Sequence, residues 1–172
     1  MDDIVKAALK KWPNVPHCYG WLALDARGDW YMRDERIQHA GPFPTVKGSR
    51  IEHPKLRDFI ERNYEHDEAG CWFFQNGPQR VYVQLEAAPW IWRLDTSGAV
   101  HSHTGLAAGT VNACWIDEQD RLFLATPQGL GLVHSMDMLE AAQAVEQGQW
   151  QPEPCSHAEL LRRYGVVIEP RP

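Results

Sequence analysis

Two histidines separated by one residue, His101 and His103, have the clearest spacing for metal chemistry in this sequence. On a β-strand, side chains at positions i and i+2 point to the same side, so both imidazoles would reach one zinc ion. Zinc enzymes usually supply three protein ligands, and Cys114 is the nearest residue of a suitable type. The alternative is a pair of solvent-facing histidines beside the turn at Gly98. Zinc at this pair is one hypothesis, and elsewhere the sequence predicts no cofactor.

Eight tryptophans are the most unusual feature of the composition. Trp90 and Trp92 stand two residues apart, and on a strand their indoles would form a flat platform for stacking a sugar, a base or a peptide. The alternative is core packing, because Leu94 continues the same face and large aromatic side chains fill the interior of small sheets. Exposure of the pair would indicate a binding patch.

Two cations, Lys47 and Arg50, lie in and beside a loop at 40–49 that is punctuated by proline and glycine. The backbone amides of this loop and its two cations would suit an anion. The spacing of a P-loop is absent, however, and a solvated turn is the simpler alternative. The predicted ligand site is a groove formed by Trp90 and Trp92 together with Lys47 and Arg50.

Motifs of the common enzyme classes are absent from the sequence. No G-x-S-x-G, H-E-x-x-H or G-x-G-x-x-G occurs. Cys18 follows His17 and Cys155 precedes His157 by two residues, but a catalytic thiolate needs a base positioned in space, which adjacency along the chain does not provide. The four cysteines include no C-x-x-C pair, which excludes a zinc ribbon. These observations favour a protein that is not an enzyme.

The charge distribution argues against nucleic acid as a partner. The 172 residues include 17 Lys and Arg against 23 Asp and Glu, which gives a net charge of −6. Between Val111 and Leu160 one base, Arg121, stands among eight acids, whereas binding to phosphate backbones requires clustered cations. The acidic start, Met1-Asp2-Asp3, lacks the basic region of a secretory signal, and no apolar run of about 18 residues follows. We therefore expect a cytoplasmic protein with reduced cysteines and no membrane contact.

A repeated Asp-led turn organises the chain. Three segments combine an Asp with a Gly or Asp three positions later: 24–28, 94–98 and 116–120. The Asp accepts backbone hydrogen bonds inside a type I turn, and the fourth residue adopts the left-handed conformation that Gly enters freely. Each segment predicts a β-hairpin, and Asn76-Gly77 predicts a fourth. The expected strands are 18–24, 29–33, 71–75, 80–86, 89–94, 99–103, 111–116 and 121–126.

Four helices are expected beside these strands. An apolar stripe predicts the first over 3–12, Pro54 begins the second, Ser135 caps the third, and a capping box at 156–159 begins the fourth. The order of elements indicates an α+β fold. We expect one antiparallel meander sheet of about six to eight short strands, built from hairpins, with about four flanking helices. A single domain over 1–172 is the default expectation at this length.

Two resemblances extend these predictions. The segment 109–130, with its D-x-x-D turn, resembles one blade of a bacterial sensor β-propeller. This likeness is local, because a propeller needs about four to eight blades. The segments KWPNVPHCYGW (11–21), FQNGPQRVYV (74–83) and APWIWR (88–93) resemble a family of small uncharacterised proteobacterial proteins, known as a domain of unknown function. That resemblance implies a bacterial cytoplasmic protein and assigns no activity or site residue.

The sequence therefore favours a non-enzymatic cytoplasmic module that binds a small molecule or a partner protein. The alternative function is a metal-dependent enzyme centred on His101 and His103. Elemental analysis separates the two, because stoichiometric zinc or iron would favour the enzyme. A third hypothesis, self-association into a homo-oligomer, depends on exposed strand edges.

Overall fold

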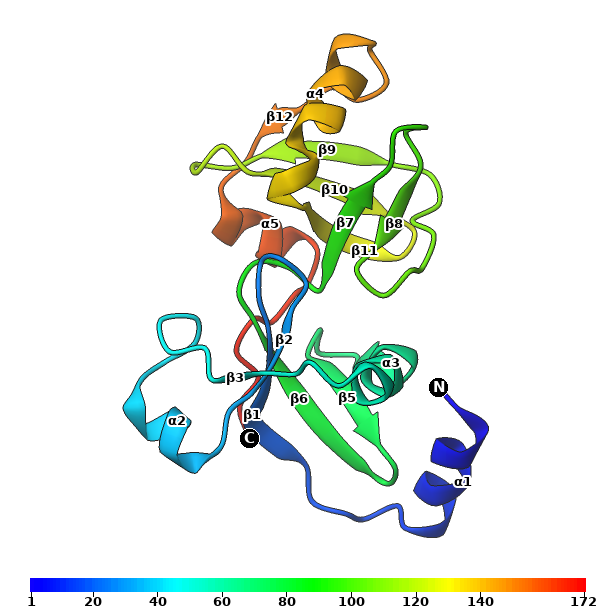
Figure 1. The fold of residues 1–172 in the computed structure, drawn as a ribbon, viewed down its shortest axis with the longest axis vertical. Coiled ribbons are helices and arrows are strands. Elements are labelled where there is room, and N and C mark those ends of the chain that lie inside the picture. The colour runs from blue at the N-terminus through cyan, green and yellow to red at the C-terminus, as the bar shows by residue number, and fades with distance from the viewer. The chain divides into compact units, whose positions relative to one another are not determined.

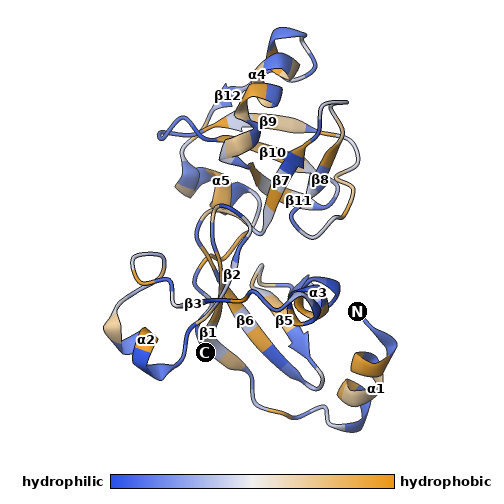
Figure 2. Ribbon diagram, in the orientation of Figure 1, coloured by the Kyte–Doolittle hydropathy of each residue, from blue (hydrophilic) through white to orange (hydrophobic).

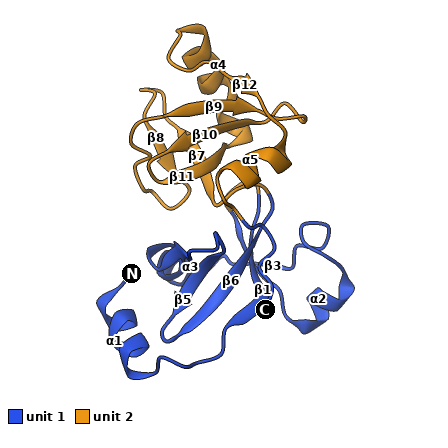
Figure 3. Ribbon diagram, turned by 180° about the vertical axis from the view of Figure 1, so that it is seen from behind, with its two compact units in different colours: residues 1–25, 29–86, 167–172 blue, residues 26–28, 87–166 orange.

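The computed structural model describes all residues from 1 to 172, and the chain divides into two compact units (Figures 1 and 3). Unit 1 comprises residues 1–25, 29–86 and 167–172, and unit 2 comprises residues 26–28 and 87–166. Two six-stranded sheets form, one within each unit. The sequence-based expectation of a single domain stays a prediction.

Unit 1 is built around a sheet with the strand order β3-β2-β1-β6-β5-β4. Its strands are β1 (Cys18–Leu24), β2 (Trp30–Met32), β3 (Ser49–Arg50), β4 (Tyr64–His66), β5 (Trp72–Asn76) and β6 (Gln79–Leu85). The helices of this unit are α1 (Asp3–Lys11), α2 (Glu35–Ala40) and α3 (Pro54–Arg62). Hydrophobic and hydrophilic colours alternate along α1 in Figure 2, as expected of an amphipathic helix, and its buried residue is Val5.

Unit 2 contains the second sheet, with the strand order β12-β9-β10-β11-β7-β8. Its strands are β7 (Trp90–Leu94), β8 (Val100–Ser102), β9 (Ala113–Ile116), β10 (Leu122–Thr126), β11 (Gly129–Val133) and β12 (Glu153–Pro154). A short 3₁₀ helix (Ser135–Asp137) precedes α4 (Met138–Glu146), and α5 (His157–Arg163) follows β12. A cluster of buried side chains forms the core of this unit: Ala87, Ala88, Ile91, Phe123, Leu130, Leu132 and Leu160.

The two sheets share one topology. In unit 1 the hairpin β1–β2 is followed by the antiparallel run β4–β5–β6, and β6 pairs in parallel with β1. In unit 2 the hairpin β7–β8 is followed by the antiparallel run β9–β10–β11, and β11 pairs in parallel with β7. The chain therefore builds the same five-strand arrangement twice, and β3 and β12 extend the two sheets.

Four turns with the same Asp chemistry join strands of these sheets. The carboxylates of Asp25, Asp67, Asp95 and Asp117 each accept a hydrogen bond from the backbone N–H four residues later, at 2.8 to 3.0 Å. The residue three positions after each Asp has a positive φ of 58° to 83°, the conformation expected for this turn. The three predicted Asp-led hairpins and the predicted hairpin at Asn76-Gly77 are thereby confirmed.

The α+β class is confirmed, but the prediction of one antiparallel sheet is wrong. Both sheets are mixed, because β1 pairs with β6 and β7 with β11 in parallel. Turn residues specify only antiparallel neighbours, whereas these pairs join strands that are far apart in the sequence. The structure has twelve strands rather than six to eight, and β3 and β12 are too short to leave a pattern. The sequence also does not predict α2, which has no buried residue and hence no apolar stripe.

Candidate functional site

An apolar pocket of about 270 Å³ lies in unit 1 on one face of its sheet. Strands β1, β2, β5 and β6 supply one part of the lining, and α3 together with Ile51, the residue after β3, supplies the rest. The lining consists of apolar side chains, one thiol and one amide: Cys18, Trp21, Leu22, Met32, Ile51, Leu56, Ile60, Phe74, Asn76 and Val81. Ligand pockets in proteins have this composition, mostly apolar with few polar groups.

A bulge in β1 shapes the sheet side of the pocket. Cys18 is opposite Val81 and Leu22 is opposite Val83, so an advance of four residues along β1 matches an advance of only two residues along β6. Gly20 in this irregular stretch has a φ of 80°, which glycine adopts without strain. In a regular strand, neighbouring side chains point to opposite faces. The bulge removes this alternation, and the neighbours Trp21 and Leu22 both line the pocket.

The α3 helix supplies the other wall. Pro54 occupies its first turn, where a missing N–H costs nothing. Leu56 and Ile60 are one helical turn apart and therefore share a face, which both present to the pocket. Ile60 is buried and anchors the helix, whereas Leu56 is exposed. Trp21 and Met32 are also exposed, so three large apolar side chains form an accessible rim around the opening.

The pocket is electrically neutral. None of its lining residues is Asp, Glu, His, Lys or Arg. Burial raises the pKa of the Cys18 thiol, so the thiol stays protonated at neutral pH and is a poor nucleophile. The side chain of Asn76 has no hydrogen-bond partner within the protein, and it can both donate and accept. The arrangement suits binding of an apolar group that carries one polar atom, and it offers no acid, base or nucleophile for catalysis.

Residues 1–171 match the family described as "Protein of unknown function (DUF2946)". The chain belongs to this family. The predicted membership of an uncharacterised family is confirmed. The search of curated proteins finds no match. A solved structure of a DUF1285 family protein from Shewanella baltica OS155 shares 15% sequence identity at a TM-score of 0.48, covering 72% of this chain and 91% of that one.

In this DUF2946 family member, the resemblance of residues 109–130 to a β-propeller blade is confined to local structure. Residues 109–130 form β9, β10 and the start of β11 in the unit 2 sheet. The shared feature is therefore one Asp-led hairpin with its flanking strands. No helix of the protein combines the length and the apolar character needed to cross a membrane.

The four residues of the predicted groove divide between the two units. Trp90 and Trp92 lie in unit 2, where both are buried, and their indole N–H groups donate to the carbonyls of Gln128 at 2.8 Å and Leu124 at 3.0 Å. Such burial is what core packing produces. A ligand-binding role for the pair stays a prediction, and it requires these indoles to become accessible.

Lys47 and Arg50 lie in unit 1, and each pairs with a carboxylate. Lys47 Nζ is 2.9 Å from Asp25 Oδ2 and 3.6 Å from Glu86 Oε2, and Arg50 is 3.0 Å from Asp29. The Asp25 side chain is buried, so Lys47 supplies a neighbouring positive charge that offsets the cost of burying the carboxylate. Binding of an anion by these two cations also stays a prediction.

The histidine pair has no third ligand in the structure. His101 lies in β8, and His103 is the first residue after this strand. The Nδ1 atom of His103 accepts a hydrogen bond from the backbone N–H of Ile91 at 3.2 Å. No group of three or more His, Cys, Asp and Glu side chains is arranged to hold a metal ion. Cys114 is buried, and desolvation raises its pKa to about 11, which disfavours the thiolate that binds zinc.

Sequence reasoning did not identify the residues of the unit 1 pocket. The signal that points to them is Gly20, a glycine inside a strand-like run of aromatic and aliphatic residues. Such a glycine often marks a bulge, and a bulge redirects the side chains beside it. Together with the apolar stripe of Leu56 and Ile60 on α3, the bulge marked by Gly20 indicates that Trp21 lies at a pocket.

Proposed function

We propose that this DUF2946 family member is a non-enzymatic binding protein whose unit 1 pocket takes an apolar small molecule with one hydrogen-bonding group. The observation that carries the proposal is the neutral pocket itself: nine apolar or thiol side chains surround it, and one amide, Asn76, supplies its hydrogen bonds. Removal of apolar surface from water supplies the driving force, at roughly 25 cal/mol per Å². Asn76 orients the ligand.

The size of the pocket sets the size of the ligand. A volume of about 270 Å³ is near the lower end for small-molecule sites, so it accommodates one or two fused rings rather than a nucleotide or a long lipid. A probe with about 11 non-hydrogen atoms, such as 2-naphthol, gains roughly 0.4 kcal/mol per atom. The corresponding Kd is on the order of 0.1 to 1 mM.

A second candidate function is the docking of an apolar side chain from a partner protein. The exposed rim of Trp21, Met32 and Leu56 favours it, because protein partners contact such patches. The neutral apolar pocket behind the rim favours the small molecule. The metal-dependent enzyme has no comparable support, since no third ligand accompanies His101 and His103.

We also propose a reducing compartment, the bacterial cytoplasm, as the location of the protein. All four cysteines are free thiols. Oxidising compartments favour disulfides, whereas reduced thiols are the rule in the cytosol.

Saturation-transfer NMR with 2-naphthol and the full chain tests the proposed function. We expect saturable binding that falls at least about ten-fold in Trp21→Ala, which corresponds to about 1.4 kcal/mol. Trp12→Ala is the matched control, because Trp12 is 51% exposed and Trp21 39% exposed, and Trp12 does not line the pocket. Absence of saturable binding, or equal binding by the two variants, contradicts the proposal.

A further inference from the structure

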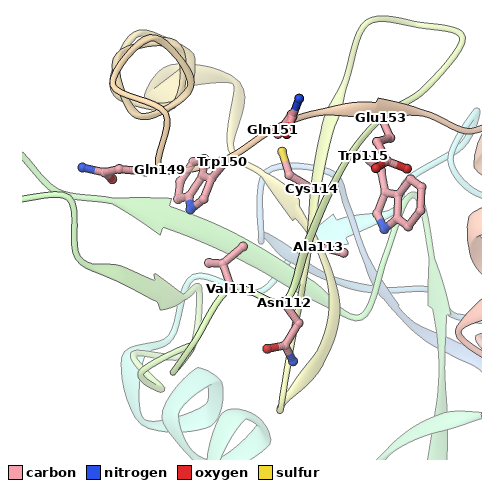
Figure 4. A pocket seen from close by; sticks show the side chains of 9 residues that line it. All are labelled: Val111, Asn112, Ala113, Cys114, Trp115, Gln149, Trp150, Gln151 and Glu153. Atoms are coloured by element: carbon pink, nitrogen blue, oxygen red, sulfur yellow. The ribbon is translucent and has the colours of Figure 1, made fainter.

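A second pocket, of about 230 Å³, lies at the edge of the unit 2 sheet (Figure 4). One wall is residues 111–115, which lead into and form most of β9, and the other is residues 149–153, which lead into β12. β12 pairs with β9 only at Glu153 and Pro154. Before that pairing the two segments separate, and the pocket lies between them.

Backbone hydrogen bonds hold the 149–153 wall at both ends. At its start, Gly148 adopts a left-handed φ of 73° at the end of α4, and the Gln149 N–H donates to the Ala144 carbonyl at 2.9 Å. Just beyond its end, the Cys155 N–H donates to the Ile116 carbonyl at 3.0 Å. The pocket is therefore formed without a ligand, which lowers the entropy cost of binding.

The polar side chains of this pocket are amides and one carboxylate. Three of them, Asn112, Gln151 and Glu153, make no hydrogen bond within the protein, and neither does the indole N–H of Trp150. An amide presents donors and an acceptor together, which matches the hydroxyl group of a ligand. Their hydrogen-bonding capacity is available to a bound molecule.

The charges of the lining residues disfavour an anionic ligand. None of the lining residues is Lys, Arg or His. Unit 2 as a whole has five basic and nine acidic residues. Phosphate or carboxylate would therefore meet no cation in the lining and would be repelled by Glu153. The guanidinium of Arg163 lies over the Trp115 ring, 4.7 Å from its centroid, and is not part of the lining.

The remaining surface of the pocket is aromatic and apolar. Trp150 and Trp115 contribute indoles, and Figure 4 shows the Cys114 side chain between them. Cys114 is buried, and the raised pKa of its thiol keeps it protonated and unreactive. Trp115 is already engaged, because its indole N–H donates to the Tyr164 hydroxyl at 2.9 Å. Trp150 is the indole left for a ligand.

We propose that this pocket binds one ring of a neutral sugar, with the C–H face of the ring on Trp150 and its hydroxyls on Asn112, Gln151 and Glu153. A pyranose ring combines an apolar C–H face with hydroxyls around its edge, so an indole and a set of unpaired amides match both parts of it. The site is distinct from the unit 1 pocket, and neither proposal depends on the other.

Titration of the ¹⁵N-labelled full chain with methyl glucopyranoside, methyl galactopyranoside and methyl mannopyranoside tests this site. We expect saturable amide shifts within 111–115 and 149–153 for at least one sugar, with a Kd on the order of 1 to 10 mM. Trp150→Ala reduces this affinity at least about ten-fold, and Gln151→Ala, an exposed substitution, at least about five-fold. Trp12→Ala leaves it unchanged, and Trp150→Ala still binds 2-naphthol.

The absence of saturable shifts with all three glycosides overturns the sugar site. If choline then gives saturable shifts at the same amides, the indole and Glu153 belong to a site for a cationic ligand instead. The amide shifts at 111–115 and 149–153 report on unit 2 alone. Failure of the sugar site therefore leaves the 2-naphthol result of unit 1 unaffected, and failure of the 2-naphthol site leaves the sugar result unaffected.

Discussion

The Trp92 indole packs against the backbone of Gly131 in β11, and this contact yields a sharp prediction. A Cβ added at Gly131 would lie 2.2 Å from Trp92 Nε1 and 2.5 Å from Cε2, whereas non-bonded atoms prefer about 3.5 to 4.0 Å. The φ of Gly131 is not positive, so an alanine there is hindered by contact and not by backbone conformation. Glycine is needed at this position because the indole occupies the space of a side chain.

The cost of Gly131→Ala follows from these contacts. Overpacking of a core costs about 1 to 3 kcal/mol. Displacing the buried indole also weakens its hydrogen bond to the Leu124 carbonyl at 3.0 Å, which contributes about 1 kcal/mol. We expect the free energy of unfolding to fall by about 3 kcal/mol. Gly98→Ala, where a Cβ meets nothing within 4 Å and φ is 82°, is the control for backbone strain alone, at about 1 kcal/mol.

A double-mutant cycle in the full chain isolates the contact. Trp92→Leu alone costs about 3 kcal/mol through the cavity it leaves, and the added methyl of Gly131→Ala fits into that space. The double variant is therefore more stable than the sum of the single effects implies, with a coupling of about 2 kcal/mol. Urea unfolding followed by far-UV circular dichroism measures all four proteins without relying on indole fluorescence. Additive effects, or a cost below about 1 kcal/mol for Gly131→Ala, would refute the reasoning.

Two further predictions concern charged groups. Lys47→Met removes the cation beside the buried Asp25 carboxylate and should lower the free energy of unfolding by about 2 kcal/mol in urea titrations; an unchanged midpoint would show that the pair contributes nothing. The hydrogen bond from Arg93 holds the pKa of Asp137 below its ordinary value of 3.8. The ionised Asp137 carboxylate therefore stabilises the fold above pH 3.8, and this stabilisation is lost as the pH falls through the lowered pKa of the folded state. Asp137→Asn should therefore cost about 2 kcal/mol at neutral pH and less near pH 3, and an equal cost at both would contradict the assignment.

The Asp-led turns show why part of the fold was predictable. The Asp25, Asp95 and Asp117 turns are specified by residues within five positions of one another, so sequence alone locates them. Asp67 has the same hydrogen bonds and a glycine three residues later, but the strand before it, β4, has only three residues and leaves no readable alternation. The parallel pairs that complete both sheets depend on contacts between distant segments, which no local pattern contains.

The site residues were harder to predict for a related reason. Trp90 and Trp92 have a regular i, i+2 spacing, but periodicity identifies a face and does not say whether another layer covers it. Trp21 owes its place at the pocket to a bulge and to α3, which is distant in sequence. Trp150 owes its place to the turn at Gly148 and to the pairing of β12 with β9.

The central claim, that the neutral pocket of unit 1 is a ligand site, is tested most directly by mapping 2-naphthol on the ¹⁵N-labelled full chain. We expect saturable shifts that centre on the Trp21 indole N–H and on the amides of Leu56 and Asn76, with unit 2 unperturbed. Saturable shifts confined to residues outside the pocket, or no shifts at all, would contradict it.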